Sequence, residues 1–303
     1  MNNSERDLLE YVCAGNLKKA RQQAKIIVEK INTATDKDFK QRRLEELAKA
    51  EQHLIELPYN MQGLLAATDV SKFPEHRFVL RPDEAAVVDD ILAIREVAHK
   101  LAELGIAYSP SLLLYGVSGG GKTMLAKYIA YKADLPFVYV RFSGLIESHL
   151  GATSNNVARI FDFARSNPCV LCFDELDAVA MARNTQHDHA EMSRVVIAIM
   201  QELDNMPNDN IIIAATNRFK DIDPAVVRRF SKRHEVKLLD SASVAQLAKR
   251  FFAAAGIATN GWLPAWLVAN FDDVGQPASK VIECCTEQVI AELKGNVGLF
   301  EGK

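Results

Sequence analysis

The chain has 303 residues, of which 49% are hydrophobic and 25% charged, and its net charge is −3. This is the composition of a globular protein with a sizeable core, and its balanced charge argues against a broad nucleic-acid-binding surface. The first residues, MNNSERDLLEYV, lack the basic and apolar regions of a signal peptide. No apolar run reaches the roughly 18 residues of a membrane span. We therefore expect a cytoplasmic protein.

Residues 1–57 predict a small helical region. Apolar residues recur at helical spacing from Leu8 to Cys13, from Leu17 to Ile31 and from Phe39 to Ile55. The sequence leaves two interpretations open. The region is either a plain helical hairpin or three-helix unit, or a domain that binds an adaptor or a substrate.

Residues 58–77 show no periodicity and predict a linker. Residues 78–240 then alternate helical segments with apolar runs, beginning with a helix that Asp83 is expected to cap. The nearly continuous apolar runs predict a five-stranded parallel sheet covered on both faces. The predicted strands are residues 111–116, 136–142, 169–174, 211–216 and 234–239.

Residues 241–303 predict a small helical subdomain. Helices are expected at 241–256 and about 276–294, with Trp262 and Trp266 in the core or against the larger domain.

The five cysteines do not indicate a disulfide framework, because their number is odd and no secretory signal is recognised. Cys169 and Cys172 form a CxxC pair, but no second pair or neighbouring histidines complete a zinc site. Both lie in the apolar run CVLCF, which favours buried structural thiols over metal ligands.

The segment GVSGGGKT fits the phosphate-binding pattern G-x-x-x-x-G-K-[ST] and lies between a predicted strand and a predicted helix. Its glycines let backbone N–H groups point at phosphate oxygens, and the helix N-terminus adds positive potential. Lys122 would contact the β- and γ-phosphates of ATP, and the Thr123 hydroxyl would bind Mg²⁺. The predicted nucleotide-binding residues are Gly116, Val117, Ser118, Gly119, Gly120, Gly121, Lys122, Thr123 and Met124.

Two carboxylates, Asp174 and Glu175, follow the apolar strand of VLCFDELD. Asp174 would hold Mg²⁺, and Glu175 would polarise the attacking water as a general base. Adjacent carboxylates after a strand can also cap a helix. Their place about 50 residues after a phosphate loop favours the catalytic interpretation.

Polar residues at the end of IIIAATNR and within DPAVVRRFSKRHEV complete the predicted site. Asn217 would hydrogen-bond the γ-phosphate or the lytic water, although asparagine is also a common turn residue. Arg228 and Arg229 would lie at the end of a short helix and reach the nucleotide of a neighbouring subunit. The alternative is a solvated basic turn.

Over about residues 78–295, the order and spacing of these motifs resemble the AAA ATPases, a clade of hexameric protein-remodelling motors. LLLYGVSGGGKTMLAKYIA resembles the first strand, phosphate loop and helix of the family, CVLCFDELDAV its acidic motif and IIIAATNR its sensor strand. The segment DPAVVRRFSKRHEV is similar to the arginine-finger segment of katanin, spastin and the ATPase that disassembles ESCRT filaments. The resemblance implies a P-loop NTPase αβα sandwich with a helical lid, and a ring of subunits with nucleotide at their junctions.

The resemblance also implies a pore that grips a polypeptide. In the family, the loop after the second strand lines this pore. At that position the chain has His149, Leu150 and Gly151, with histidine in place of the usual aromatic residue. A second pore loop would follow at residues 182–194. There, His187 and His189 are weak candidates for a metal site, and substrate contact or solvation is favoured.

Two segments depart from the family. The phosphate loop reads VSGGG where the family usually has two prolines and a threonine, yet its backbone freedom is kept. The lid segment VGQPASKVIEC lacks a nucleotide-contacting arginine that some relatives have. Whether Lys280 replaces it is left open.

We therefore expect an ATP-hydrolysing protein-remodelling motor that uses ATP and Mg²⁺. It would act on a protein substrate as a homo-oligomer, a hexamer by resemblance, and an adaptor would bind through residues 1–57. Two alternatives are a nucleic-acid-associated ATPase, such as a clamp or helicase loader, and a nucleotide-switch scaffold. Balanced charge disfavours the first, and the complete set of hydrolytic residues disfavours the second.

Overall fold

The computed structural model describes the chain from residue 3 to residue 294 with several gaps. The described residues are 3–13, 17–31, 38–44, 55–106, 108–146, 152–177, 188–204, 206, 209–259, 261–272 and 274–294.

A twisted sheet forms the centre of the molecule, and its six strands within the described residues have the order β1-β3-β4-β5-β2-β6. The strands β2, β3, β4, β5 and β6 pair parallel with one another, whereas β1 runs antiparallel to β3. β4 and β5 are buried along their whole length, as expected for apolar strands covered on both faces. The strands are β1 (Leu65–Thr68), β2 (Ser111–Tyr115), β3 (Phe137–Val140), β4 (Val170–Phe173), β5 (Ile211–Thr216) and β6 (Lys232–Glu235).

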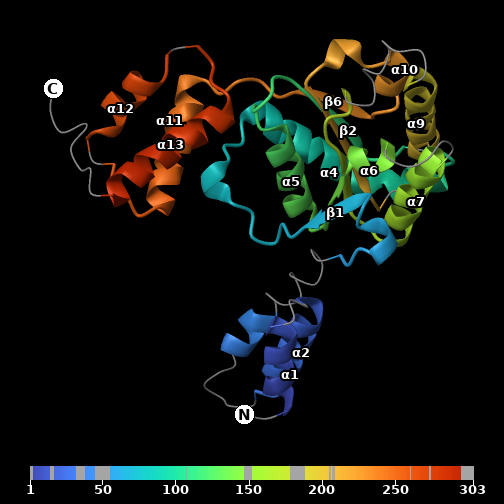
Figure 1. Ribbon diagram of the computed structural model, residues 1–303, viewed down its shortest axis with the longest axis horizontal. Coiled ribbons are helices and arrows are strands. Elements are labelled where there is room, and N and C mark those ends of the chain that lie inside the picture. Colours follow the sequence, from blue (N-terminus) through green and yellow to red (C-terminus); the bar gives the residue numbers. More distant parts are fainter. Residues whose placement is uncertain are drawn as a thin grey trace.

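Helices cover both faces of this sheet (Figure 1). α4 (Pro82–Glu103) and α5 (Lys122–Ala133) pack on one face, and α6 (Phe142–Ile146), α7 (Ala152–Ser166) and α9 (Asp188–Leu203) on the other. Alternate strand residues point to opposite faces, so Leu112 joins the core under α5 while Leu113 joins the core under α7. The predicted αβα sandwich is confirmed.

The five predicted parallel strands are present, and the sheet differs from the prediction only at its two edges. β1 lies within residues 58–77, which were predicted to be a linker, between the short 3₁₀ helices η2 (Tyr59–Met61) and η3 (Glu75–Arg77). Four residues are too few to show a period, yet Leu65 is buried against the sheet. The last strand, β6, ends at Glu235, whereas residues 234–239 were predicted. The apolar residues beyond it do not belong to the strand: Val236 packs into the core under α5, and Leu239 packs into a second core.

That second core belongs to a helical lid, built from α11 (Ser241–Ala254), α12 (Leu263–Asn270) and α13 (Ala278–Leu293). The rings of Phe252, Trp262 and Trp266 pack edge to face, and Trp266 is buried. The predicted lid helices and the packing of both tryptophans are confirmed, and α12 is an addition.

A buried arginine connects the lid to the sandwich. The guanidinium of Arg81 donates to the carbonyls of Lys237 at 2.7 Å and Leu238 at 3.0 Å, and pairs with Glu84 at 2.6 Å. Its backbone N–H also donates to Glu84 at 3.0 Å. α4 therefore begins at Pro82 behind this reciprocal pair, one residue before the predicted cap Asp83.

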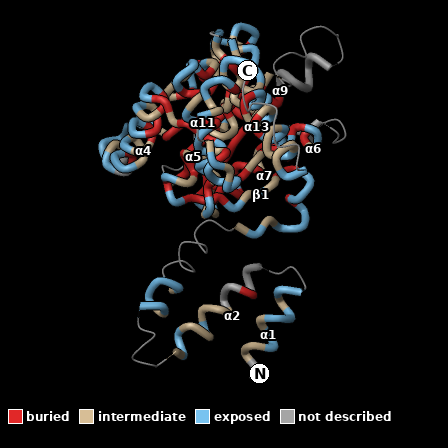
Figure 2. The backbone as a smooth tube through the Cα atoms, turned by 90° about the vertical axis from the view of Figure 1, so that its left-hand side faces the viewer, coloured by how far each residue is buried: buried red, intermediate tan, exposed pale blue. Residues whose placement is uncertain are grey.

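The amino-terminal helices α1 (Asn3–Cys13) and α2 (Leu17–Glu29) pack on each other, and residues 38–44 are also helical. Figure 2 shows mostly exposed and half-buried backbone here, in contrast to the buried interior of the sandwich. The helical character is confirmed for these residues, and the boundaries of the domain remain a prediction.

Two further findings concern the helices and the cysteines within the described residues. None of the helices there is long and apolar enough to cross a bilayer. Cys169 and Cys172 are buried in the sheet, and burial raises the pKa of the Cys169 thiol to about 12. These cysteines are therefore protonated structural residues.

Candidate nucleotide-binding site

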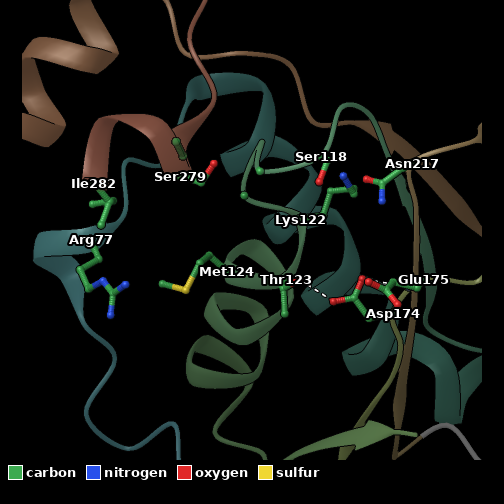
Figure 3. A pocket seen from close by; sticks show the side chains of 13 residues that line it. Arg77, Ser118, Lys122, Thr123, Met124, Asp174, Glu175, Asn217, Ser279 and Ile282 are labelled. Carbon is green, nitrogen blue, oxygen red and sulfur yellow. Dashed lines mark hydrogen bonds between the residues drawn. The ribbon is translucent and has the colours of Figure 1, made fainter. Parts of the chain in front are cut away.

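A cavity of about 390 Å³ lies at the carboxyl ends of β2, β4 and β5, between α5 and α13 of the lid (Figure 3). This is the edge of an open parallel sheet at which ligands bind. The cavity brings together side chains that are far apart in the sequence. Its lining residues are Arg77, Ser118, Gly119, Gly121, Lys122, Thr123, Met124, Asp174, Glu175, Asn217, Ala278, Ser279 and Ile282.

The phosphate loop connects β2 to α5 and has a backbone that needs glycine. Gly116 and Gly119 have φ angles of +141° and +73°. A Cβ at Gly116 would collide with the carbonyl of Val236, and one at Gly119 would collide with Ser279. Close packing and positive φ angles therefore hold the loop curled at the start of α5.

Lys122 is the first residue of α5 and is only 7% exposed. Its ammonium donates to the carbonyls of Gly116 at 3.0 Å and Val117 at 2.7 Å. Burial lowers the pKa of Lys122, and the nearby carboxylates of Asp174 and Asp177 oppose that effect. A buried ammonium at the N-terminus of a helix is well suited to an anionic ligand.

Thr123 and Asp174 lie side by side, and the threonine hydroxyl donates to Asp174 Oδ2 at 2.5 Å. A hydroxyl and a carboxylate are the hard oxygen ligands that Mg²⁺ prefers. The described residues contain no group of three or more His, Cys, Asp or Glu side chains that could hold a metal ion. Mg²⁺ typically takes only one or two carboxylates and completes its shell with water and phosphate oxygens, so this pair fits a magnesium–nucleotide complex.

Glu175 follows Asp174 in a tight turn and has a φ angle of +57°, which is unusual for a residue other than glycine. Its N–H donates to Asp174 Oδ1 at 3.0 Å, and the next N–H, of Leu176, donates to the carbonyl of Ala215 at 2.9 Å. The side chain of Glu175 is exposed and lies beside Asp174 in the cavity (Figure 3). Backbone strain of this kind is common at functional sites.

Asp177 is a functional candidate that the sequence analysis did not single out, although VLCFDELD contains it. Its Oδ1 accepts from the Thr216 hydroxyl at 2.9 Å and from the Asn217 N–H at 3.3 Å. The acidic turn after β4 thereby holds the end of β5 in place. Asn217 lines the cavity on the same side as Lys122 and Glu175.

At the opposite end of the cavity, Met124 of α5 lies near Arg77 and Ile282 (Figure 3). Ser279 of α13 lies between the two ends, and its N–H donates to the carbonyl of Gly119 at 3.1 Å. The lid thus contacts the phosphate loop directly. Lys280, whose role was left open, is not among the lining residues.

The two arginines predicted as fingers lie outside the cavity. Both follow α10 (Pro224–Val227) and are exposed, and Arg229 forms an ion pair with Asp204 of the same chain. The predicted pore residues His149, Leu150 and Gly151 lie outside the described residues, as does His187 of the second predicted loop.

Residues 112–238 match the family model described as the ATPase family associated with various cellular activities (AAA). An uncharacterized AAA family ATPase of Sinorhizobium fredii is 35% identical over 58% of this chain and 53% of its own length. The proteasome-activating nucleotidase of Aeropyrum pernix is 36% identical over 60% of this chain and 47% of its own. The chain thus spans about half the length of these curated relatives.

Among solved structures, the AAA domain of FIGL-1 in complex with ADP resembles this chain with a TM-score of 0.60. The alignment covers 81% of this chain and 83% of the FIGL-1 chain at 20% identity, which supports the fold alone. The match of the family model falls on the sheet, the phosphate loop and the acidic turn that form the cavity. Residues 112–238 of the chain therefore form a domain of the AAA family of ATPases.

Proposed function

We propose that the chain hydrolyses ATP with Mg²⁺ and uses the energy to remodel protein substrates. One observation carries the proposal: a single cavity joins the buried ammonium of Lys122, the Thr123–Asp174 pair, Glu175 and Asn217. These groups supply, in order, phosphate binding, metal binding, activation of water and sensing of the γ-phosphate.

Each residue has a role that follows from its place. Lys122 exchanges the loop carbonyls for phosphate oxygens, which are stronger acceptors because they are charged. Thr123 and Asp174 hold Mg²⁺, which neutralises charge on the phosphates. Glu175 accepts a proton from the attacking water, and Asn217 orients the water or the γ-phosphate.

A remodelling role is supported by the relatives. The proteasome-activating nucleotidase of Aeropyrum pernix is named for a nucleotide-dependent action on a protein machine. We infer a homo-oligomeric ring, with six subunits as the family resemblance implies, in which Arg228 and Arg229 complete the site of a neighbour. The loop at His149, Leu150 and Gly151 would grip the polypeptide, and residues 1–57 would bind an adaptor.

A Glu175→Gln variant tests the hydrolytic assignment. Glutamine keeps the size of the side chain but cannot accept the proton, so ATP should still bind while turnover falls by roughly 10²- to 10⁴-fold. Calorimetry measures binding, and phosphate release measures turnover. Because bound ATP persists in this variant, size-exclusion chromatography should show a larger oligomer with ATP than without it.

The effect of added polypeptide or DNA on ATP turnover by the wild-type chain identifies the class of substrate. Turnover by the wild-type chain should rise with an unfolded polypeptide and not with single- or double-stranded DNA. Stimulation by DNA alone would favour the nucleic-acid-associated alternative. Wild-type turnover in Glu175→Gln would exclude Glu175 as the general base.

A further inference from the structure

Arg77 is a pocket residue that the hydrolytic mechanism does not use. It ends η3, whose backbone is fixed by the Arg77 N–H donating to the Pro74 carbonyl at 2.9 Å. The next residue, Phe78, is buried, and its ring lies 5.5 Å from Phe73 and 5.1 Å from Tyr128. This aromatic cluster anchors η3 to the sandwich, so Arg77 projects into the cavity from a fixed base.

The same segment is also held by the lid. The guanidinium of Arg250 donates to the Phe78 carbonyl at 3.0 Å, and Val79 packs in the lid core. Arg77 therefore lies where sandwich and lid meet, and its position relative to both sides of the cavity is defined.

The place of Arg77 in the cavity limits what it can contact. Lys122, Asp174 and Asn217 occupy the phosphate end, whereas Arg77, Met124 and Ile282 occupy the other end (Figure 3). A nucleotide with its phosphates on Lys122 extends its ribose and base toward this second end. Met124 and Ile282 offer apolar surface to a flat ring, and Arg77 offers the charged side chain at this end.

Chemistry then favours a contact with the base. Within the described part of the chain, no hydrogen bond or ion pair engages the guanidinium of Arg77, which is exposed to the cavity. A guanidinium is planar and only donates, so it pairs with ring acceptors such as purine N7. We propose that Arg77 binds the purine base of the nucleotide by donating a guanidinium N–H to a ring nitrogen. This inference rests on the proposed nucleotide site.

Isothermal titration calorimetry with two ligands separates a base contact from a charge effect. ATP carries the base, and inorganic tripolyphosphate carries only the phosphates, both with Mg²⁺. Arg77→Ala should weaken ATP binding by roughly 3- to 10-fold, the range for the loss of one hydrogen bond. It should leave tripolyphosphate binding unchanged.

Two further variants sharpen the result. Arg77→Lys keeps the charge but replaces the planar guanidinium with a flexible ammonium, so ATP affinity should fall here too. Lys72→Ala removes an exposed positive charge of the same segment outside the cavity and should leave both ligands unaffected. Circular dichroism of each variant verifies folding.

The outcomes are decisive for Arg77. Equal losses for ATP and tripolyphosphate, full ATP affinity in Arg77→Lys, or no loss in Arg77→Ala would each overturn the base contact. Lys122→Ala reports on the proposed function separately, because it should abolish binding of both ligands. If that variant binds ATP normally, the nucleotide site itself is wrong, whatever Arg77 does.

Discussion

At the scale of single residues, Asp177 connects the two catalytic segments. One carboxylate oxygen accepts from both the Thr216 hydroxyl and the Asn217 N–H. The same turn carries Glu175, so the proposed general base and the proposed γ-phosphate sensor share one hydrogen-bonded support. Asp177 does not line the cavity, and it acts as a positioning residue.

Replacing Asp177 by alanine should lower kcat for ATP hydrolysis by roughly 10- to 100-fold, because a misplaced catalytic group costs that much even when binding survives. KM should change little. Asp177→Asn is the matched control, since its amide oxygen still accepts both hydrogen bonds, and it should recover most of the lost kcat. Steady-state phosphate release at varied ATP measures both constants.

A different pattern would assign Asp177 another role. Its charge helps to keep Lys122 protonated against the effect of burial. If Asp177→Asn raised KM as much as Asp177→Ala, the charge on Lys122 would matter and the support of Asn217 would not.

The site residues show how far sequence reasoning reaches. Lys122, Thr123, Asp174, Glu175 and Asn217 were predicted because each follows an apolar strand within a spaced motif, and the structure brings all of them to one cavity. Arg77 was missed because η3 has neither period nor motif, and only folding brings it beside α5. Ser279 was missed for a similar reason, since its role depends on the docking of the lid.

At the scale of elements, the buried strands were predictable and the edge strands were not. Apart from Thr216 at the end of β5, β4 and β5 consist of buried apolar residues, which is typical of strands covered on both faces. β6 instead has the polar sequence KRHE, with alternate residues more exposed. The strand was therefore predicted at residues 234–239, which include the apolar residues that follow β6. β1 and β6 form the two edges, where pairing on one side relaxes the demand for apolar residues.

The first helix of the lid has a cap that makes its contribution to stability testable. Asp240 accepts from the Ser243 N–H at 2.8 Å at the N-terminus of α11, and its hydrogen bonds to Ser243 lower the pKa of this carboxyl below its ordinary value. Asp240→Ala should destabilise the lid by about 0.5–2 kcal/mol at neutral pH. Amide hydrogen exchange along α11 measures that change.

The pH dependence of this effect has a defined sign. A carboxyl whose pKa is lowered in the folded state stabilises the fold at every pH above its pKa in the unfolded state. This contribution is lost as the pH falls through the pKa of the folded state. The difference between wild type and Asp240→Ala should therefore stay constant from neutral to mildly acidic pH. Asp240→Asn keeps an uncharged cap and should remain close to wild type throughout. A difference that disappears already at mildly acidic pH would contradict the assignment.

At the scale of the whole molecule, Lys122 is the one cation at the phosphate end of the cavity among the described lining residues, because Arg77 lies at the other end. Arg228 and Arg229 are exposed outside it. Arg229 pairs with Asp204, a carboxylate that it would exchange for a phosphate in an assembled ring. An arginine finger supplied by a neighbour would complete the site and make turnover depend on assembly.

Mixing two inactive variants tests this arrangement. Arg228→Ala/Arg229→Ala subunits retain Glu175, and Glu175→Gln subunits retain the arginines. The double-arginine variant alone should lose roughly 10³-fold or more of its turnover, the contribution measured for such fingers. Glu175→Gln alone should lose roughly 10²- to 10⁴-fold. Subunits mixed before ATP is added should form junctions with an intact Glu175 on one side and intact arginines on the other, so phosphate release should exceed that of either variant alone. Normal turnover by the double-arginine variant, or mixtures that never exceed the separate variants at any ratio, would count against shared sites.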